Sequence, residues 1–369
     1  MKELEVFKSK RVLFAAIFAG LLLIAGCGHS SSSGKKASFS ATDLSGTWHT
    51  IVTGGKAYGS FNGYGYMEIS ESGEILSGSI INYGVDTQRF TGGALAVTAK
   101  GEITGTVDTF LPDSGTSGSH TVLDGQMTPG KDTILLAGNF TLSRNGIGIL
   151  IKEEGSFTVS DLKGDWIFPM DGIFSVSIDD HGEIVSCTYT SYKDETGMCE
   201  GNFSVSAQGN VCGTIRVMPP KPFEIGFEGR MNVRKNHMII TGGITTGFAG
   251  MASLAIKADS GHSVADGKGK WKIFMAASED TLYGAVFLSN TGDVKEGYWE
   301  TFSGGNGSFT EGNLFISGHG NISGMINMSN GNVVAIQDGG INTDNNVAVF
   351  SYQDLENRQG TGVMIRLLQ

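Results

Sequence analysis

The chain contains Asp43-Leu44-Ser45-Gly46-Thr47-Trp48, and two later stretches repeat its pattern. The second copy is Asp161-Leu162-Lys163-Gly164-Asp165-Trp166, and the looser third copy is Asp266-Gly267-Lys268-Gly269-Lys270-Trp271. Each copy opens a segment of about one hundred residues with a similar pattern. Three of the four tryptophans stand in these openings. The repeated Gly-x-Trp therefore predicts three copies of one domain.

The middle of each copy carries the closest internal match, in which residues 93–105 align with 201–213 and with 312–324. Each segment is predicted to be a hairpin, because a glycine at its centre adopts positive φ at little cost. These turn glycines are Gly101, Gly209 and Gly320. A similar hairpin precedes each one, with turns at Gly73, Gly182 and Gly292. A third hairpin follows, with turns around Gly130, Asn236 and Asn345.

The pattern throughout is that of strands and turns. Short alternating apolar runs are separated by Gly, Asn, Asp and Ser from Gly46 onward, and 56 glycines against 6 prolines indicate many tight turns. One opening strand, three hairpins and one closing strand give about eight strands per copy. Because rolling such a sheet shut removes its edges and buries its apolar face, we predict an all-β chain of three tandem antiparallel meander barrels. The expected domains are 43–158, 161–260 and 264–369. Six propeller blades or a single transmembrane barrel are the alternatives.

Each copy also ends in a similar way, with an apolar run followed by one cation. The last strand of a closed barrel pairs with the first, so each cation is expected on the face of the opening tryptophan. These two ends together resemble the calycins, namely lipocalins, avidins and fatty-acid-binding proteins, in many of which a basic residue on the last strand covers the tryptophan. The resemblance implies structural plugs that close the barrel bottoms, formed by Trp48 with Lys152, Trp166 with Lys257, and Trp271 with Arg366.

Residues 1–26 have the build of a secretory signal, because basic residues precede an apolar run over 12–25. The run ends in Leu23-Ile24-Ala25-Gly26-Cys27, which resembles the lipobox of bacterial lipoproteins. The resemblance implies that Cys27 is acylated, as by palmitate, and anchors the chain to a membrane. A transmembrane anchor or an uncleaved signal is the alternative, although the run is short for a span of roughly 20 residues.

The residues that follow are expected to form the anchor and its tether. Residues 27–42 are rich in Ser, Gly and Lys, which is typical of a flexible linker. In lipoprotein families with a similar signal, an Asp directly after the cysteine resembles a mark for retention at the inner membrane. This chain has Gly28 at that position. We therefore expect a lipid-anchored protein of the cell envelope, at the outer membrane on its periplasmic or surface face.

Charge argues against nucleic acid as a partner. The chain has a net charge of −11, and removal of residues 1–26 takes away four basic and two acidic side chains, which leaves about −13. Phosphate binding needs a clustered basic surface, so no nucleic-acid partner is expected.

Three cysteines, Cys187, Cys199 and Cys212, lie in the second copy. An exported protein meets an oxidising compartment, in which disulfides form. The predicted hairpin places Cys187 and Cys199 on adjacent strands, so they are the candidate disulfide and Cys212 is expected to be free. Neither a zinc template nor a haem attachment motif is present, so no metal and no cofactor are predicted.

No nucleophile, base and orienting acid can be nominated together, so no catalytic residue is predicted. His181, His237 and His319 fall in predicted turns, where a solvated histidine is expected. Trp299, the tryptophan outside the repeated phrase, lies either on an exposed sugar or peptide platform or on a buried aromatic face.

The leading functional hypothesis is a non-enzymatic binding or envelope-interaction module for a small hydrophobic, glycan or protein ligand. A structural spacer with solid barrels is the alternative. A hydrolase or other enzyme with an unrecognised site is the third hypothesis.

Overall fold

The computed structural model describes residues 38–54, 61–82, 87–141, 144–170, 172–191, 195–219, 222–244, 251–277, 281–356 and 358–368. Residues 1–37, which include the predicted signal, Cys27 and most of the predicted tether, lie outside the described residues. No helix within the described ranges is long and apolar enough to span a membrane.

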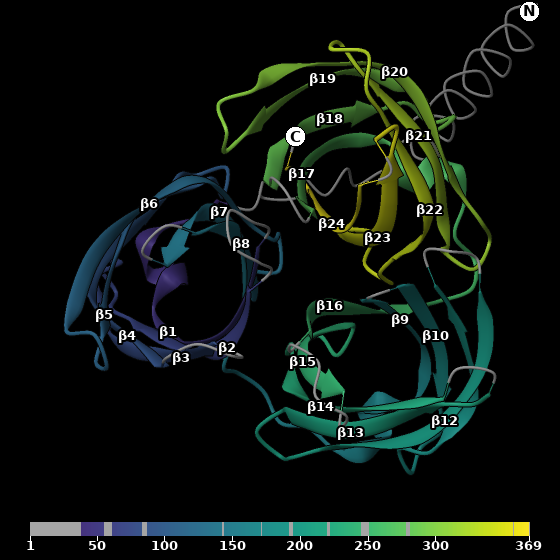
Figure 1. The fold of residues 1–369 in the computed structure, drawn as a ribbon, viewed down its shortest axis with the longest axis horizontal. Helices are drawn as coiled ribbons and strands as arrows, with labels where there is room; N and C mark the ends of the chain where they lie inside the picture. The colour runs from purple at the N-terminus through teal and green to yellow at the C-terminus, as the bar shows by residue number, and fades with distance from the viewer. Residues whose placement is uncertain are drawn as a thin grey trace, which may run out of the picture. The chain divides into compact units, whose positions relative to one another are not determined.

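Three closed antiparallel barrels of eight strands each follow one another along the chain (Figure 1). The predicted all-β class and the three tandem barrels are confirmed. The propeller alternative is wrong, because the eight strands of each copy pair around a complete circle instead of forming two separate blades. The single transmembrane barrel is wrong for the same reason.

The first barrel closes where β1 pairs with β8, with Trp48 opposite Lys152. Its strands are β1 (Gly46–Gly54), β2 (Phe61–Ile69), β3 (Ile75–Asn82), β4 (Thr87–Val97), β5 (Ile103–Leu111), β6 (Thr116–Met127), β7 (Thr133–Thr141) and β8 (Arg144–Lys152).

The second barrel closes where β16 pairs with β9, with Lys257 opposite Trp166. Its strands are β9 (Gly164–Met170), β10 (Gly172–Ile178), β11 (Ile184–Thr190), β12 (Thr196–Val205), β13 (Asn210–Val217), β14 (Phe223–Met231), β15 (His237–Ile244) and β16 (Met251–Ala258).

The third barrel closes where β17 pairs with β24, with Trp271 opposite Arg366. Its strands are β17 (Gly269–Ala277), β18 (Thr281–Leu288), β19 (Val294–Thr301), β20 (Asn306–Ile316), β21 (Ile322–Met328), β22 (Val333–Ile341), β23 (Val347–Asp354) and β24 (Gln359–Arg366).

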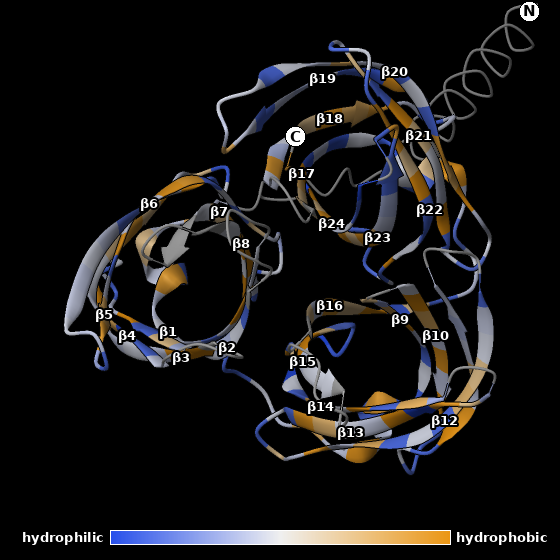
Figure 2. Cartoon of the chain, in the orientation of Figure 1, coloured by the Kyte–Doolittle hydropathy of each residue, from blue (hydrophilic) through white to orange (hydrophobic). Residues whose placement is uncertain are grey.

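Alternating side chains give each barrel its own apolar core. Buried and exposed residues alternate along strands such as β13, and hydrophobic and hydrophilic residues alternate along many strands in Figure 2. Trp48, Trp166 and Trp271 are among the most buried side chains, at 0%, 0% and 1% exposure. Each therefore belongs to the core of its own barrel.

A short 3₁₀ helix precedes each opening strand, which the sequence analysis did not predict. These helices are η1 (Ala41–Leu44), η2 (Val159–Leu162) and η3 (Val264–Gly267). In each, the aspartate of the repeated phrase accepts a hydrogen bond from the backbone N–H three residues earlier, at 2.7–2.8 Å. The aspartate that recurs in all three copies thus caps each helix, which four-residue helices need because they make few internal hydrogen bonds.

The predicted turns lie where the glycines were expected. All six turn glycines of the first two hairpins have positive φ, between 78° and 91°. In the third hairpin the positive-φ residues are Lys131, Lys235 and Asn345, so the turn centres shift by one residue from the predicted Gly130 and Asn236.

Outward-facing apolar side chains of all three barrels form one further cluster. Ile51 and Leu135 come from the first barrel, Ile239 and Ile256 from the second, and Val349 from the third, all at 0% exposure. Their burial explains why strands near each closure are apolar on both faces, where an isolated barrel would alternate.

The three equivalent turns between β6 and β7, β14 and β15, and β22 and β23 contact one another through polar groups. Asn232 Nδ2 donates to Asp132 Oδ2 at 2.9 Å, and Arg234 Nη1 contacts Asp344 Oδ2 at 3.0 Å. Arg234 Nε lies 3.9 Å from Asp132 Oδ2. One arginine of the second barrel thus faces a carboxylate from each of the other two.

His237 lies at this junction, and its predicted solvated position is wrong. The residue is 1% exposed, because it begins β15 directly against the first barrel. Its Nδ1 hydrogen-bonds Asn236 Oδ1 at 2.8 Å and its Nε2 lies 2.5 Å from Thr133 Oγ1. A residue next to a turn is exposed only when no second domain covers that turn.

Candidate functional site

The proposed plugs have similar geometry in all three barrels. Lys152 Nζ lies 5.7 Å from the centroid of the Trp48 ring, and Lys257 Nζ lies 5.6 Å from that of Trp166. The guanidinium carbon of Arg366 lies 5.2 Å from the Trp271 ring centroid. These distances fall within the range of cation–π contacts, about 6 Å.

Backbone carbonyls of the 3₁₀ helices hold both members of each pair. Trp166 Nε1 donates to Leu162 O at 2.6 Å, and Lys257 Nζ donates to Asp161 O at 3.0 Å. The other two barrels repeat these hydrogen bonds through Leu44, Gly267, Asp43 and Asp266. The pKa of Lys257 is lowered by burial, although the nearby Asp161 carboxylate acts in the opposite direction. Both members of the pair are thus fixed to the helix that precedes the first strand of the barrel.

The cysteines lie in the second barrel as a bonded pair and a free thiol. Cys187 on β11 and Cys199 on β12 form a disulfide with their Cα atoms 5.0 Å apart. Cys212 is free and exposed, and its Sγ lies 3.0 Å from Ser204 Oγ.

Among the described residues, Asp179, Asp180 and His181 form one group that could hold a metal ion. They lie at the turn between β10 and β11, where the His181 side chain is 80% exposed. Asp179 Oδ1 already accepts the backbone N–H groups of His181 and Glu183. The cluster is thus accounted for by turn formation, as such residues commonly are.

A cavity of about 450 Å³ occupies the third barrel at the end opposite Trp271. Its walls are apolar or aromatic deep in the barrel and polar at the connections between strands. The apolar lining comprises Met275, Leu282, Trp299, Met328, Val334 and Tyr352. The polar and charged lining includes Thr301, Ser303, Asn330, Asn332, Asp354, Glu356 and Arg358. Both the volume and this mixture are typical of small-molecule sites.

Trp299 forms part of the cavity wall and is held in place by the hairpin that follows it. The side chain points into the barrel, is only 4% exposed, and donates from Nε1 to Ser308 O at 3.2 Å. Its ring passes so close to Gly307 that a Cβ there would lie 2.7 Å from ring atom Cζ2. The buried-face interpretation of Trp299 is therefore the one that the structure supports.

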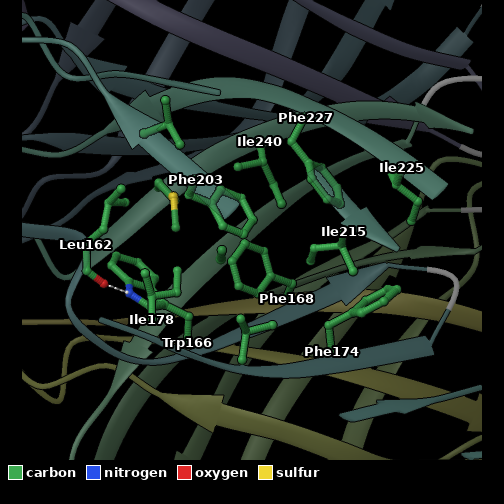
Figure 3. Packing of buried hydrophobic residues seen from close by; sticks show 14 of the residues in the cluster. Leu162, Trp166, Phe168, Phe174, Ile178, Phe203, Ile215, Ile225, Phe227 and Ile240 are labelled. Carbon is green, nitrogen blue, oxygen red and sulfur yellow. Dashed lines mark hydrogen bonds between the residues drawn. The ribbon is translucent and has the colours of Figure 1, made fainter. Parts of the chain in front are cut away.

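The second barrel fills the corresponding space with rings. Phe174 and Tyr189 have centroids 4.6 Å apart, and Tyr189 and Phe223 have centroids 5.5 Å apart. Phe168, Phe203 and Phe227 stack deeper in the same barrel (Figure 3). The described part of this barrel is thus packed with aromatic side chains over most of its length.

Strand register identifies the equivalent positions in the third barrel. Tyr189 and Trp299 each lie seven residues after a turn glycine, and Phe174 and Gly284 each lie eight residues before it. Val217 and Met328 are equivalent positions. Phe223 pairs with Val217 and Asn332 pairs with Met328, so Asn332 is the equivalent of Phe223. Two of the three rings are therefore replaced, by Gly284 and Asn332, and of these two residues Asn332 lines the cavity.

A turn organised by Asp354 forms one side of the cavity mouth. Asp354 Oδ1 accepts the N–H groups of Glu356 and Arg358 at 3.0 and 2.9 Å, and its Oδ2 contacts Arg358 Nε at 2.6 Å. Burial alone would raise the pKa of Asp354, but the hydrogen bonds from Arg358 and Asn332 outweigh it and hold the pKa below its ordinary value. The carboxylate stays ionised.

The sequence analysis missed Gly284, Asn332 and Asp354. A signal for the first two was available, since aligning the copies sets a glycine and an asparagine against the two phenylalanines of the second barrel. The alignment indicates a difference in the barrel interior only when these positions are known to face inward at the open end of the barrel. That requires the strand register.

No protein-family model matches the chain, and no curated protein matches its sequence. Among solved structures, a variant of transferrin-binding protein B from Haemophilus parasuis is similar at 9% identity, with a TM-score of 0.28, over 87% of this chain and 75% of that one. The same protein from Neisseria meningitidis matches at 9% identity and a TM-score of 0.27, over 83% and 65%. Kievitone hydratase from Nectria haematococca matches at 7% identity and a TM-score of 0.21, over 93% and 96%. Likeness this weak carries no argument about function.

Proposed function

We propose that this chain is a non-enzymatic, lipid-anchored binding protein of the bacterial cell envelope whose third barrel holds a small ligand. The observation that carries the proposal is the cavity of about 450 Å³ at the open end of that barrel. Asn332, which lines this cavity, stands where the second barrel has the ring of Phe223. The other two barrels then act as supports, through the apolar cluster that all three share.

Equilibrium binding of a fluorescent apolar probe tests the proposal. N-phenyl-1-naphthylamine is titrated into the chain from residue 28 onward, and its emission is expected to rise on binding. Asn332→Phe restores the ring at the position of Phe223 and is expected to abolish the rise, because the ring would occupy the cavity. Asn202→Phe on the exposed outer wall of the second barrel is the matched control and is expected to bind the probe normally.

A solid-barrel spacer makes the opposite prediction. If the barrels are solid, N-phenyl-1-naphthylamine should show no saturable binding to the wild-type chain, or binding that Asn332→Phe leaves unchanged. Either result would reject the ligand-binding proposal in favour of the structural alternative.

The membrane anchor rests on the lipobox Leu23-Ile24-Ala25-Gly26-Cys27. Cys27→Ser is expected to abolish labelling with radioactive palmitate and to release the protein from the membrane fraction. Labelling that persists in this variant would overturn the assignment. The outer-membrane position, argued from Gly28, and the domain limits 43–158, 161–260 and 264–369 stay predictions.

A further inference from the structure

We propose that the third barrel selects uncharged amphiphiles and discriminates against carboxylates and other organic anions. The inference rests on the proposed function and concerns the chemical class of its ligand. An apolar or aromatic end of the ligand would lie against Trp299, and a hydroxyl or amide group would lie at the mouth.

The cation that lines the cavity is already neutralised. Arg358 Nε contacts Asp354 Oδ2 at 2.6 Å, and Arg358 Nη1 contacts Glu356 Oε2 at 3.1 Å. Among the described residues, the charged lining therefore consists of two carboxylates and one guanidinium, with a net charge of −1. An incoming anion would have to displace one of these carboxylates from Arg358 or remain without a cationic partner.

Deeper in the cavity, the described lining residues include no positively charged side chain. Met275, Leu282, Met328 and Val334 are apolar, and the indole N–H of Trp299 is used by Ser308 O. Moving an unpaired carboxylate from water to such surroundings costs several kcal/mol. The net charge of −11 for the whole chain acts in the same direction on any anion that approaches.

Uncharged polar groups, by contrast, remain at the mouth for a neutral ligand. Asn330 accepts the N–H of Asn332 through its Oδ1 at 3.0 Å, and its Nδ2 makes no hydrogen bond within the described part of the chain. Thr301 Oγ1 and Ser303 Oγ lie 2.9 Å apart on the facing hairpin. These amide and hydroxyl groups can exchange hydrogen bonds with a hydroxyl or an amide of the ligand without leaving a buried charge unpaired.

Two probes with the same ring systems separate this inference from the proposed function. N-phenyl-1-naphthylamine is uncharged, and 1-anilinonaphthalene-8-sulfonate adds one negative charge to the same rings. Signal that survives Asn332→Phe is subtracted as binding outside the cavity. The wild-type chain is expected to bind the uncharged probe at least about tenfold more tightly, because the anion lacks a cationic partner.

The variant Glu356→Gln makes the test specific to the mouth. It frees Arg358 Nη1 and raises the net charge of the lining from −1 to zero, so the preference for the uncharged probe is expected to fall by about threefold. Glu296→Gln is the matched control, since Glu296 is exposed on the outer wall of the same barrel, and it is expected to leave the preference unchanged.

Equal affinity for both probes in the wild-type chain would overturn the charge selection while leaving the ligand-binding proposal intact. An unchanged preference in Glu356→Gln would do the same, because the mouth charges would then play no part. Binding of neither probe would reject both proposals.

Discussion

Lys257 Nζ lies 5.6 Å from the centroid of the Trp166 ring and donates a hydrogen bond to Asp161 O at 3.0 Å. An equivalent pair of a cation and a tryptophan occurs in the other two barrels, Lys152 with Trp48 and Arg366 with Trp271, at the strand pairing that closes each of them. The recurrence ties the repeated Gly-x-Trp to barrel closure, and it leads to the first prediction.

Lys257→Ala should lower the free energy of unfolding by about 1–2 kcal/mol, because both the cation–π contact and the hydrogen bond to Asp161 O are lost. Trp166→Ala should cost about 3–5 kcal/mol, since the ring is fully buried. Urea unfolding followed by circular dichroism measures both. Lys163→Ala, at an exposed position of the same phrase, is the control, and a Lys257 variant as stable as that control would contradict a closing role.

Thr133→Val should lower the free energy of unfolding by about 1–3 kcal/mol, because it keeps the shape of the side chain but leaves the buried Nε2 of His237 without its hydrogen bond. Thr106→Val, at an exposed position on β5, is the matched control. Urea unfolding of both variants makes the comparison. Equal stabilities would show that the hydrogen bond between Thr133 and His237 contributes nothing to stability.

Acid should destabilise the protein through His237. Burial lowers its pKa from the ordinary 6.5 by disfavouring the imidazolium, although Asp132 and Asp344 act in the opposite direction and Arg234 in the same one. At a pH between the lowered pKa of His237 in the folded state and 6.5 in the unfolded state, the unfolded chain binds one more proton than the folded chain. The free energy of unfolding therefore decreases as the pH falls below 6.5, and His237 has no such effect above that pH. The free energy of unfolding should therefore be lower at pH 5.5 than at pH 7.5.

The pH prediction is checked by urea unfolding at pH 7.5 and 5.5. His237→Asn should reduce the difference between the two pH values, whatever its effect at pH 7.5. His181→Asn removes an exposed histidine and should leave the difference as it is. A His237 variant with the wild-type pH dependence would refute the assignment.

Loss of a ring should cost more in the second barrel than in the third. Phe174→Ala should lower the free energy of unfolding by about 3–5 kcal/mol, because Phe174 is 1% exposed and packs against Tyr189. Trp299→Ala should cost about 1–2 kcal/mol less, since the Trp299 ring borders the cavity and has fewer neighbours to lose. Calorimetry on both variants gives the comparison, and a larger cost for Trp299 would mean that the third barrel is filled.

The number of barrels, their all-β class and the positions of most turns could be predicted from the amino-acid sequence. Repeated local chemistry suffices for these features, because Gly101, Gly209 and Gly320 favour positive φ wherever they stand and alternating apolar residues favour strands. The closing pairs were also accessible from sequence, since a closed barrel pairs its last strand with its first and the resemblance to calycins implied a contact between Trp48 and Lys152.

Two features could be found only in the three-dimensional structure: the burial of His237 between two barrels and the cavity inside the third barrel. The burial of His237 depends on a surface of the first barrel that lies about one hundred residues away in sequence. The cavity depends on the direction in which the Asn332 side chain points and on how the neighbouring side chains pack around it. The periodicity of apolar residues indicates which face of a strand is buried. The extent to which side chains fill the barrel interior depends on their combined volume over all eight strands.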